Sequence, residues 1–183
     1  MVPTSPPNPP AAAAPSPVIR RVDVELDHFA VMQLTAEYLA WVAEGVRTHV
    51  DPFAMFDAAG AEEVVKKLCR LVPPLGAFYL VEHDGEPAGM GGWRVIAPRV
   101  AEFKRIYLRP AFRGLRLGQT LVQRLIDDAR ACGCERAVLD TTPFMQAAQR
   151  LYAQAGFVDC APYAGTEVPP AWHGRWRFMT RSL

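Results

Sequence analysis

Cysteine, net charge and long hydrophobic runs are all scarce in this 183-residue sequence. With a formal net charge of +1, the chain has no overall field that would draw it to nucleic acid or to a membrane surface. Four cysteines are too few for a disulfide framework, and Cys132 and Cys134 lack the second pair of ligands that a zinc site needs. We therefore expect free thiols in a reducing compartment, no bound metal and no nucleic-acid partner.

No uninterrupted apolar stretch approaches the roughly 20 residues that a membrane-spanning helix needs. The N-terminus has no cationic region followed by an apolar run, so we expect no secretory signal, a cytoplasmic location and no membrane partner. The loop of P-loop NTPases, the Gly-x-Ser-x-Gly elbow and the His-Glu-x-x-His helix are also missing. Gly89 to Gly92 lie inside a predicted strand with no helix after it, which excludes a dinucleotide-binding fingerprint.

Composition divides the chain into a tail and one domain. Residues 1–17 carry no charge, seven prolines and four consecutive alanines, and we expect this segment to be disordered. Residues 18–183 are long enough for a single domain with a hydrophobic core. The order of elements mixes hairpins with a strand–helix–strand unit, which predicts an α/β fold: a mixed sheet of six to seven strands flanked by about four helices. The predicted strands are 18–22, 77–82, 87–95, 100–108, 136–141, 157–161 and 175–180, and the predicted helices are 29–45, 62–71, 117–132 and 144–155.

Several residues predict where these elements end or turn. Gly45 is expected to end the first helix. The pair Asp84-Gly85 predicts a hairpin between the second and third strands. Thr142-Pro143 is typical of a helix start, with the hydroxyl as N-cap and proline in the first turn. In the fourth strand, apolar residues are spaced by three and then by two, which predicts a bulge near Lys104-Arg105.

The segment Arg113–Gly118 joins the fourth strand to the helix 117–132. A strand that turns over small residues into a helix leaves unpaired backbone N–H groups at one spot, and the helix dipole adds partial positive charge there. Between Arg99 and Arg116 there are six basic residues and one acid. These features predict a site for the phosphate oxygens of a small polyanion, although the same charges would also suit a solvated strand edge.

Two motifs resemble those of the GNAT superfamily of N-acetyltransferases. Arg113–Gly118 is similar to its pyrophosphate loop Gln/Arg-x-x-Gly-x-Gly/Ala, with Arg116 at the fourth position, which is usually glycine. Leu151–Phe157 is similar to its Leu-Tyr-x-x-x-Gly-Phe signature, and the element order over residues 18–183 is that of the GNAT fold. The resemblance implies an enzyme that transfers an acetyl group from acetyl-CoA to a primary amine of a small molecule or peptide. It also implies direct attack in a ternary complex, since no cysteine or serine occupies a motif position for covalent chemistry.

The resemblance also assigns roles to residues. The bulged fourth strand would splay from the fifth and admit the pantetheine arm, and Tyr152, a phenol protonated at neutral pH, would be the general acid. Glu102 lies eleven residues before Arg113, at the offset of the general base in histone-type members; the alternative is a surface carboxylate paired with Lys104 or Arg105. The implied cofactor-binding residues are Ile106, Tyr107, Leu108, Arg113, Gly114, Leu115, Arg116, Leu117, Gly118, Gln119 and Ala148.

Two departures from the family pattern keep a second function open. Met145 stands where many members carry an asparagine that bonds pantetheine, and Arg116 replaces a glycine. A CoA-binding regulatory or interaction module that has lost transfer chemistry would tolerate both. A homodimer also stays open, because dimers are common among similar proteins. The candidate acceptor-lining residues are Trp41, His49, Phe53, Phe56, Tyr163, Trp172 and His173.

Overall fold

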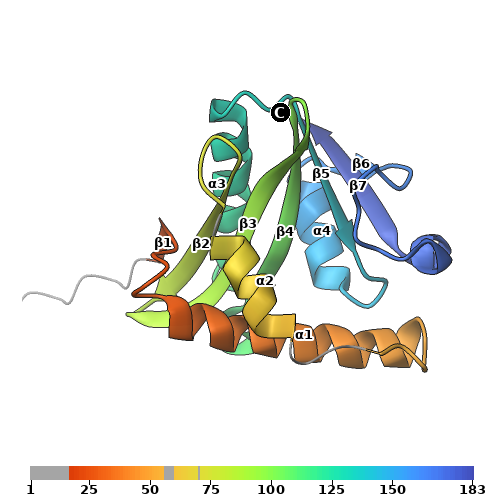
Figure 1. Ribbon diagram of the computed structural model, residues 1–183, viewed down its shortest axis with the longest axis horizontal. Helices are drawn as coiled ribbons and strands as arrows, with labels where there is room; N and C mark the ends of the chain where they lie inside the picture. Colours follow the sequence, from red (N-terminus) through yellow and green to blue (C-terminus); the bar gives the residue numbers. More distant parts are fainter. Residues whose placement is uncertain (1–16, 56–59, 70) are drawn as a thin grey trace, which may run out of the picture.

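A twisted mixed sheet crosses the molecule, with helices on both of its faces (Figure 1). The computed structural model describes residues 17–55, 60–69 and 71–183. Within these ranges the sheet has seven strands in the order β1-β2-β3-β4-β5-β7-β6. Only β4 and β5 are parallel neighbours among them, so the predicted mixed sheet is confirmed. The strands are β1 (Val18–Arg21), β2 (Gly76–His83), β3 (Glu86–Ala97), β4 (Val100–Leu108), β5 (Arg136–Thr141), β6 (Val158–Asp159) and β7 (Arg177–Ser182).

Four α-helices in the described part of the chain cover this sheet, in agreement with the predicted number. In Figure 1, α1 and α2 lie in front of the sheet, and α3 and α4 lie behind it. Short 3₁₀ turns follow β4 at Pro110–Phe112 and precede β7 at Pro170–Arg175. The helices are α1 (His28–His49), α2 (Gly60–Cys69), α3 (Leu117–Ala131) and α4 (Gln146–Gln154).

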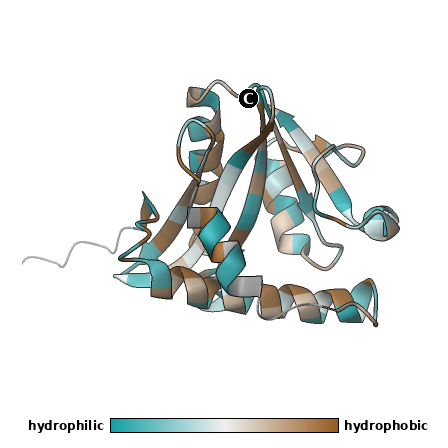
Figure 2. Cartoon of the chain, viewed as in Figure 1, coloured by the Kyte–Doolittle hydropathy of each residue, from teal (hydrophilic) through white to brown (hydrophobic). Residues whose placement is uncertain are grey.

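The alternation of side chains along β2 builds two hydrophobic cores. Phe78 and Leu80 face α1 and α2, in a cluster with Val31 and Leu34. Tyr79 and Val81 face the other way, into the larger cluster formed with α3 and α4. Figure 2 shows β2 and β5 as largely hydrophobic, while α2 presents a hydrophilic outer surface. Burial of both sheet faces fixes the register of the strands, because a slip by one residue would exchange the two cores.

The first helix does not end at Gly45, as the sequence predicted; it continues to His49. A Cβ at Gly45 would lie 2.2 Å from the ring of Phe144. Glycine is therefore needed here because the aromatic ring packs closely against the helix, and it does not end the helix. The helix stops only where Asp51-Pro52 breaks it. This extension places α1 across the edge at which β4 and β5 separate, as Figure 1 shows.

The start of the last helix also differs from the prediction. Its N-cap is Met145, and no side chain caps it. Thr142 instead begins a turn, in which Met145 N donates to Thr142 O at 3.2 Å. The turn directs Phe144 toward α1, where its ring meets that of Trp41 edge-on at 6.0 Å. Tertiary packing of Phe144 therefore overrides the local capping signal.

The predicted hairpin and bulge are confirmed. Asp84 and Gly85 both have positive φ, as a two-residue hairpin turn requires. In β4 the register with β3 shifts between Met90 and Gly92, and Arg105 has φ +54°. The bulge thus leaves one extra residue in β4 at the predicted place.

Part of the predicted organisation lies outside the described residues. This applies to residues 1–16 of the expected tail and to Phe56. Among the described helices, none combines the length and the hydrophobicity that a membrane crossing requires.

Candidate active site

The bulge separates the two parallel strands at the centre of the sheet. β4 and β5 pair only from Val100 to Glu102 on the β4 side. Beyond the bulge, Arg109 N donates to Ala88 O at 2.9 Å, toward β3. Because backbone groups alternate along a strand, the N–H groups of Leu108 and Ile106 face the opposite edge, where β5 has moved away. This edge of β4 is free to pair with an extended ligand.

A cavity opens along this free edge, on the α3 side of the gap. It is bounded by β4, by the loop that follows it and by α4. Of the predicted cofactor-binding residues, only Leu115 is not part of its wall, and this side chain is 47% exposed. We call this the cofactor-side cavity; it is lined by Trp41, Ile106, Tyr107, Leu108, Arg113, Gly114, Arg116, Leu117, Gly118, Gln119, Phe144, Met145, Gln146, Ala147, Ala148, Leu151 and Tyr152.

The loop at the mouth of this cavity presents backbone N–H groups. Gly114 and Arg116 have φ +86° and +60°, which turn the chain sharply into α3. The first backbone hydrogen bond at the start of α3 is donated by Thr120 N to Arg116 O at 3.1 Å. The amides of residues 117–119 therefore precede the helical ladder, at the positive end of the helix dipole. Such an arrangement binds phosphate oxygens.

Arg113 is held in place beside this loop. Its Nε donates to Leu108 O at 3.2 Å, and its guanidinium lies 5.5 Å from the ring centroid of Trp41. Neither Arg113 nor Arg116 forms an ion pair with any of the described residues. Two cations without an anion beside a row of free amides fit a ligand with several negative charges.

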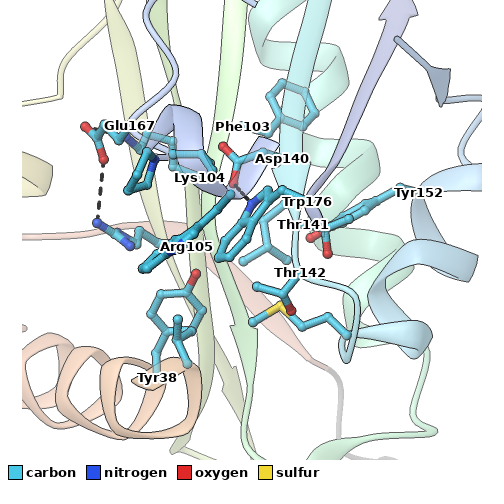
Figure 3. A pocket seen from close by; sticks show the side chains of 16 residues that line it. Tyr38, Phe103, Lys104, Arg105, Asp140, Thr141, Thr142, Tyr152, Glu167 and Trp176 are labelled. Carbon is cyan, nitrogen blue, oxygen red and sulfur yellow. Dashed lines mark hydrogen bonds and ion pairs between the residues drawn. The ribbon is translucent and has the colours of Figure 1, made fainter. Parts of the chain in front are cut away.

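A second cavity lies on the other side of the bulge. Its walls come from α1, β4, the end of β5 and the segment 167–176 before β7. Glu167 reaches in from that segment and pairs with Lys104 at 2.7 Å and with Arg105 at 3.8 Å. Figure 3 shows Arg105 and Glu167 pointing toward one another across it. We call this the acceptor-side cavity; it is lined by Tyr38, Val42, Phe103, Lys104, Arg105, Ile106, Asp140, Thr141, Thr142, Met145, Tyr152, Glu167, Val168, Pro169, Trp172 and Trp176.

The two cavities share a wall formed by Ile106, Met145 and Tyr152. Tyr152 is 5% exposed and packs edge-on against Phe157 at 6.2 Å. Burial, followed by the neighbouring Tyr38 and Asp140, holds the pKa of Tyr152 well above its usual range. Its hydroxyl is therefore a proton donor, not a phenolate, at neutral pH.

The sequence model of the acetyltransferase (GNAT) family matches residues 39–157, more than half of the chain. The chain belongs to the GNAT acetyltransferase family. It is 32% identical over 155 residues to the uncharacterized N-acetyltransferase YjgM of Escherichia coli, covering 79% of this chain and 84% of that one. It is 35% identical over 96 residues to the L-amino acid N-acyltransferase MnaT of Escherichia coli, covering 51% of this chain and 53% of the relative.

The fold agrees with this assignment. The crystal structure of PaiA N-acetyltransferase from Thermoplasma acidophilum in complex with coenzyme A superposes with a TM-score of 0.66 at 16% identity. The match covers 92% of this chain and 99% of that chain, which shows the same fold. The resemblance inferred from the two motifs is thus confirmed, and this GNAT protein is an acetyltransferase.

In this GNAT protein Glu102 is buried among charges and lies outside both cavity walls. Its side chain is 1% exposed; Arg94 Nε donates to it at 2.6 Å and Lys104 Nζ lies at 3.4 Å. Lys104 itself lines the acceptor-side cavity, and the hydroxyl of Tyr163, which also bonds Asp140 in that wall, lies 3.0 Å from Glu102 Oε1. The role of Glu102 as general base stays a prediction.

Sequence reasoning missed Asp140, at the end of β5. This carboxylate lines the acceptor-side cavity and accepts hydrogen bonds from Tyr163 Oη at 2.9 Å and from Trp176 Nε1 at 2.8 Å. Thr141 and Thr142 follow it, and the hydroxyl oxygens of both are buried without a hydrogen-bond partner. The available signal was an acidic residue after the buried run Ala137–Leu139, at the strand end that faces the predicted gap.

The aromatic and histidine side chains predicted to line the acceptor pocket lie in different places. Trp172 lines the acceptor-side cavity and stacks on Trp176 at 5.8 Å, whereas Trp41 lines the cofactor side. His49 stacks on Phe144, and Phe53 is 89% exposed. The others contact the cavity indirectly: Tyr163 through Asp140, and His173 through Val168, whose carbonyl lies 3.0 Å from its Nε2.

Proposed function

We propose that this protein transfers the acetyl group of acetyl-CoA to a primary amine, by direct attack within a ternary complex. The cofactor-side cavity would hold the pantetheine arm along the free edge of β4, with the pyrophosphate on the amides of residues 117–119. Arg113 and Arg116 would add charge-assisted hydrogen bonds to the phosphates. The acceptor would enter from the other cavity, so that thioester and amine meet at the shared wall.

The position of Tyr152 carries this proposal. It borders both cavities, so a group bound in either one comes within reach of its hydroxyl. When the amine attacks the thioester carbonyl carbon, a C–N bond forms and an oxyanion develops. Collapse of this intermediate breaks the C–S bond, and Tyr152 protonates the leaving thiolate of CoA. A phenol kept protonated by burial suits this role.

Direct transfer is favoured over an acyl-enzyme. The cysteines whose side chains the structure describes, Cys132, Cys134 and Cys160, lie in the walls of neither cavity. A covalent route needs an activated nucleophile next to the thioester. Glu102 is retained as a candidate base that would act through the hydroxyl of Tyr163.

A small-molecule acceptor fits the residues that line the acceptor-side cavity. The relative MnaT is an L-amino acid N-acyltransferase, and Lys104 and Arg105 lie in the cavity wall where an acidic group of an acceptor would need them. Both cations are paired with Glu167 in this structure, so an acidic acceptor would compete with that carboxylate.

The test has two arms. Calorimetric titration with acetyl-CoA measures binding, with a phosphate-free pantetheine analogue as control; we expect binding that requires the pyrophosphate. Release of the CoA thiol is then followed with spermidine, L-methionine, glucosamine and trialanine. Thiol release with at least one amine supports the enzyme. Binding of acetyl-CoA without transfer to any amine supports the regulatory module, and absence of binding overturns both.

A further inference from the structure

We propose that Asp140 is the catalytic residue that binds the acceptor's amino group and takes a proton from it, with Tyr163 as its proton-sharing partner. This inference rests on the proposed function and names the acid–base group of the same site. Figure 3 shows Asp140 in the cavity wall, with the indole of Trp176 directed at it.

Asp140 differs from the other carboxylates around this cavity in its partners. Glu102 pairs with Arg94 and Lys104, and Glu167 pairs with Arg94, Lys104 and Arg105. No lysine, arginine or histidine in the described residues pairs with Asp140; its two oxygens each accept one hydrogen bond from a neutral donor. A half-buried carboxylate without a cation attracts an ammonium group.

The hydroxyls beside it indicate a ligand at the same place. Thr141 and Thr142 are 3% and 2% exposed, both line the cavity, and neither hydroxyl oxygen has a partner. Buried polar groups in proteins are nearly always hydrogen-bonded. Two buried hydroxyls without partners next to a carboxylate therefore indicate that a polar ligand binds here. A primary amine can donate to Asp140 and to one hydroxyl at once.

The Tyr163 contact explains how Asp140 can accept a proton. The single O–H of Tyr163 lies between two carboxylates, 2.9 Å from Asp140 Oδ2 and 3.0 Å from Glu102 Oε1. Once Asp140 is protonated, it can donate to the Tyr163 oxygen, while the Tyr163 hydrogen turns to Glu102. Asp140, Tyr163 and Glu102 then each keep a hydrogen-bond partner, so the added proton leaves none of these three groups unsatisfied.

The protons of the reaction balance when Asp140 acts as the base and Tyr152 as the acid. A bound ammonium loses one proton to Asp140, which later releases it to solvent, and the neutral amine attacks the thioester carbon. The second proton leaves nitrogen as the C–N bond matures and restores the hydroxyl of Tyr152, which has protonated the thiolate. The products are the N-acetyl amine, CoA thiol and one released proton.

The test compares Asp140→Asn with Asp127→Asn, an exposed aspartate on α3 that bonds Gln123. We expect Asp140→Asn to lower kcat/KM for the amine by a factor of at least about 100, the usual contribution of a general base. Acetyl-CoA affinity should stay within about twofold of wild type in both variants, and Asp127→Asn should keep full turnover. The rate of Asp140→Asn should rise with pH up to the pKa of the amine itself, because that acceptor must then arrive neutral.

The outcomes separate this inference from the proposed function. Unchanged turnover in Asp140→Asn overturns the role of Asp140 and leaves the acetyltransferase intact. A wild-type protein that transfers acetyl to no amine overturns both. If Asp140→Asn no longer binds acetyl-CoA, the fold has been lost, and Tyr163→Phe decides: it keeps the ring packed on Phe178 but removes the shared proton. We expect it to lower turnover about tenfold; full turnover would contradict the inference.

Discussion

The cofactor-side and acceptor-side cavities share one wall but bind by different means. The first presents backbone amides from one loop and one strand edge, and no carboxylate of the described residues pairs with Arg113 or Arg116. The second presents side chains from α1, β4, β5 and the segment before β7, and its cations are already paired with Glu167. Cations that have no anion among the described residues, beside free amides, fit a ligand with several negative charges. A site built from side chains takes its specificity from the residues at those positions, whereas backbone amides are the same in every sequence.

The largest effect is expected from a substitution in the wall that the two cavities share. Tyr152→Phe keeps the buried ring but removes the hydroxyl, and we expect kcat to fall by about 100-fold to 1000-fold with binding of both substrates retained. Since burial raises the pKa of Tyr152, the wild type should show no basic limb from this group below about pH 10. Steady-state kinetics across pH measure both effects. Full turnover in the variant would remove Tyr152 as the acid.

The ion pairs next to the acceptor-side cavity should contribute to the stability of the fold. Glu102→Gln removes a carboxylate that is 1% exposed and leaves Arg94 and Lys104 with less compensation. We expect the free energy of unfolding to fall by about 2 kcal/mol, less than the roughly 3–5 kcal/mol of a fully buried pair, because Arg94 is partly exposed. Urea denaturation measures this. Glu167→Gln is the matched control with a smaller loss, since its side chain is 55% exposed; equal losses would contradict the assigned burial.

The cofactor side should respond in affinity instead. Arg113→Ala removes a cation that the Leu108 carbonyl and Trp41 hold beside the loop. We expect acetyl-CoA to bind about tenfold more weakly, which is about 1.4 kcal/mol. Calorimetry at two salt concentrations measures it, and the loss should shrink at high salt. Arg124→Ala on α3 is the matched arginine control; an equal loss in that variant would show that the effect is not local to the loop.

The smallest expected effect separates loop geometry from loop charge. Arg116 has φ +60°, a conformation that costs a non-glycine residue about 1–2 kcal/mol. Arg116→Gly should therefore raise the free energy of unfolding by about 1 kcal/mol and weaken acetyl-CoA binding only a few-fold through the lost charge. Thermal melting and calorimetry give the two values. A variant less stable than wild type would mean that the arginine side chain supports the loop.

What could be predicted from the sequence follows from the same contrast. The bulge at Arg105, the hairpin at Asp84-Gly85 and the loop Arg113–Gly118 depend on a few consecutive residues, so local spacing was sufficient. The spacing from Tyr152 to Gly156-Phe157 likewise predicted Tyr152 as the general acid. The structure places this residue in the wall that the two cavities share, and its role stays a prediction. Two local signals were overridden, at Gly45 and at Thr142-Pro143, because the ring of Phe144 packs against α1 and decides both.

The sequence by itself determined the element order, the mixed sheet and the cofactor-side loop, since these follow from backbone propensity and hydrophobic period. Only the tertiary structure decided the acceptor side. Asp140 lies at the end of β5, whereas Tyr163 and Trp176 lie on the connection from β6 to β7. They meet because β7 pairs with β5 and carries this connection back across the gap. A site made of side chains from distant segments has no local spacing to reveal it, because its geometry is set by strand pairing and packing.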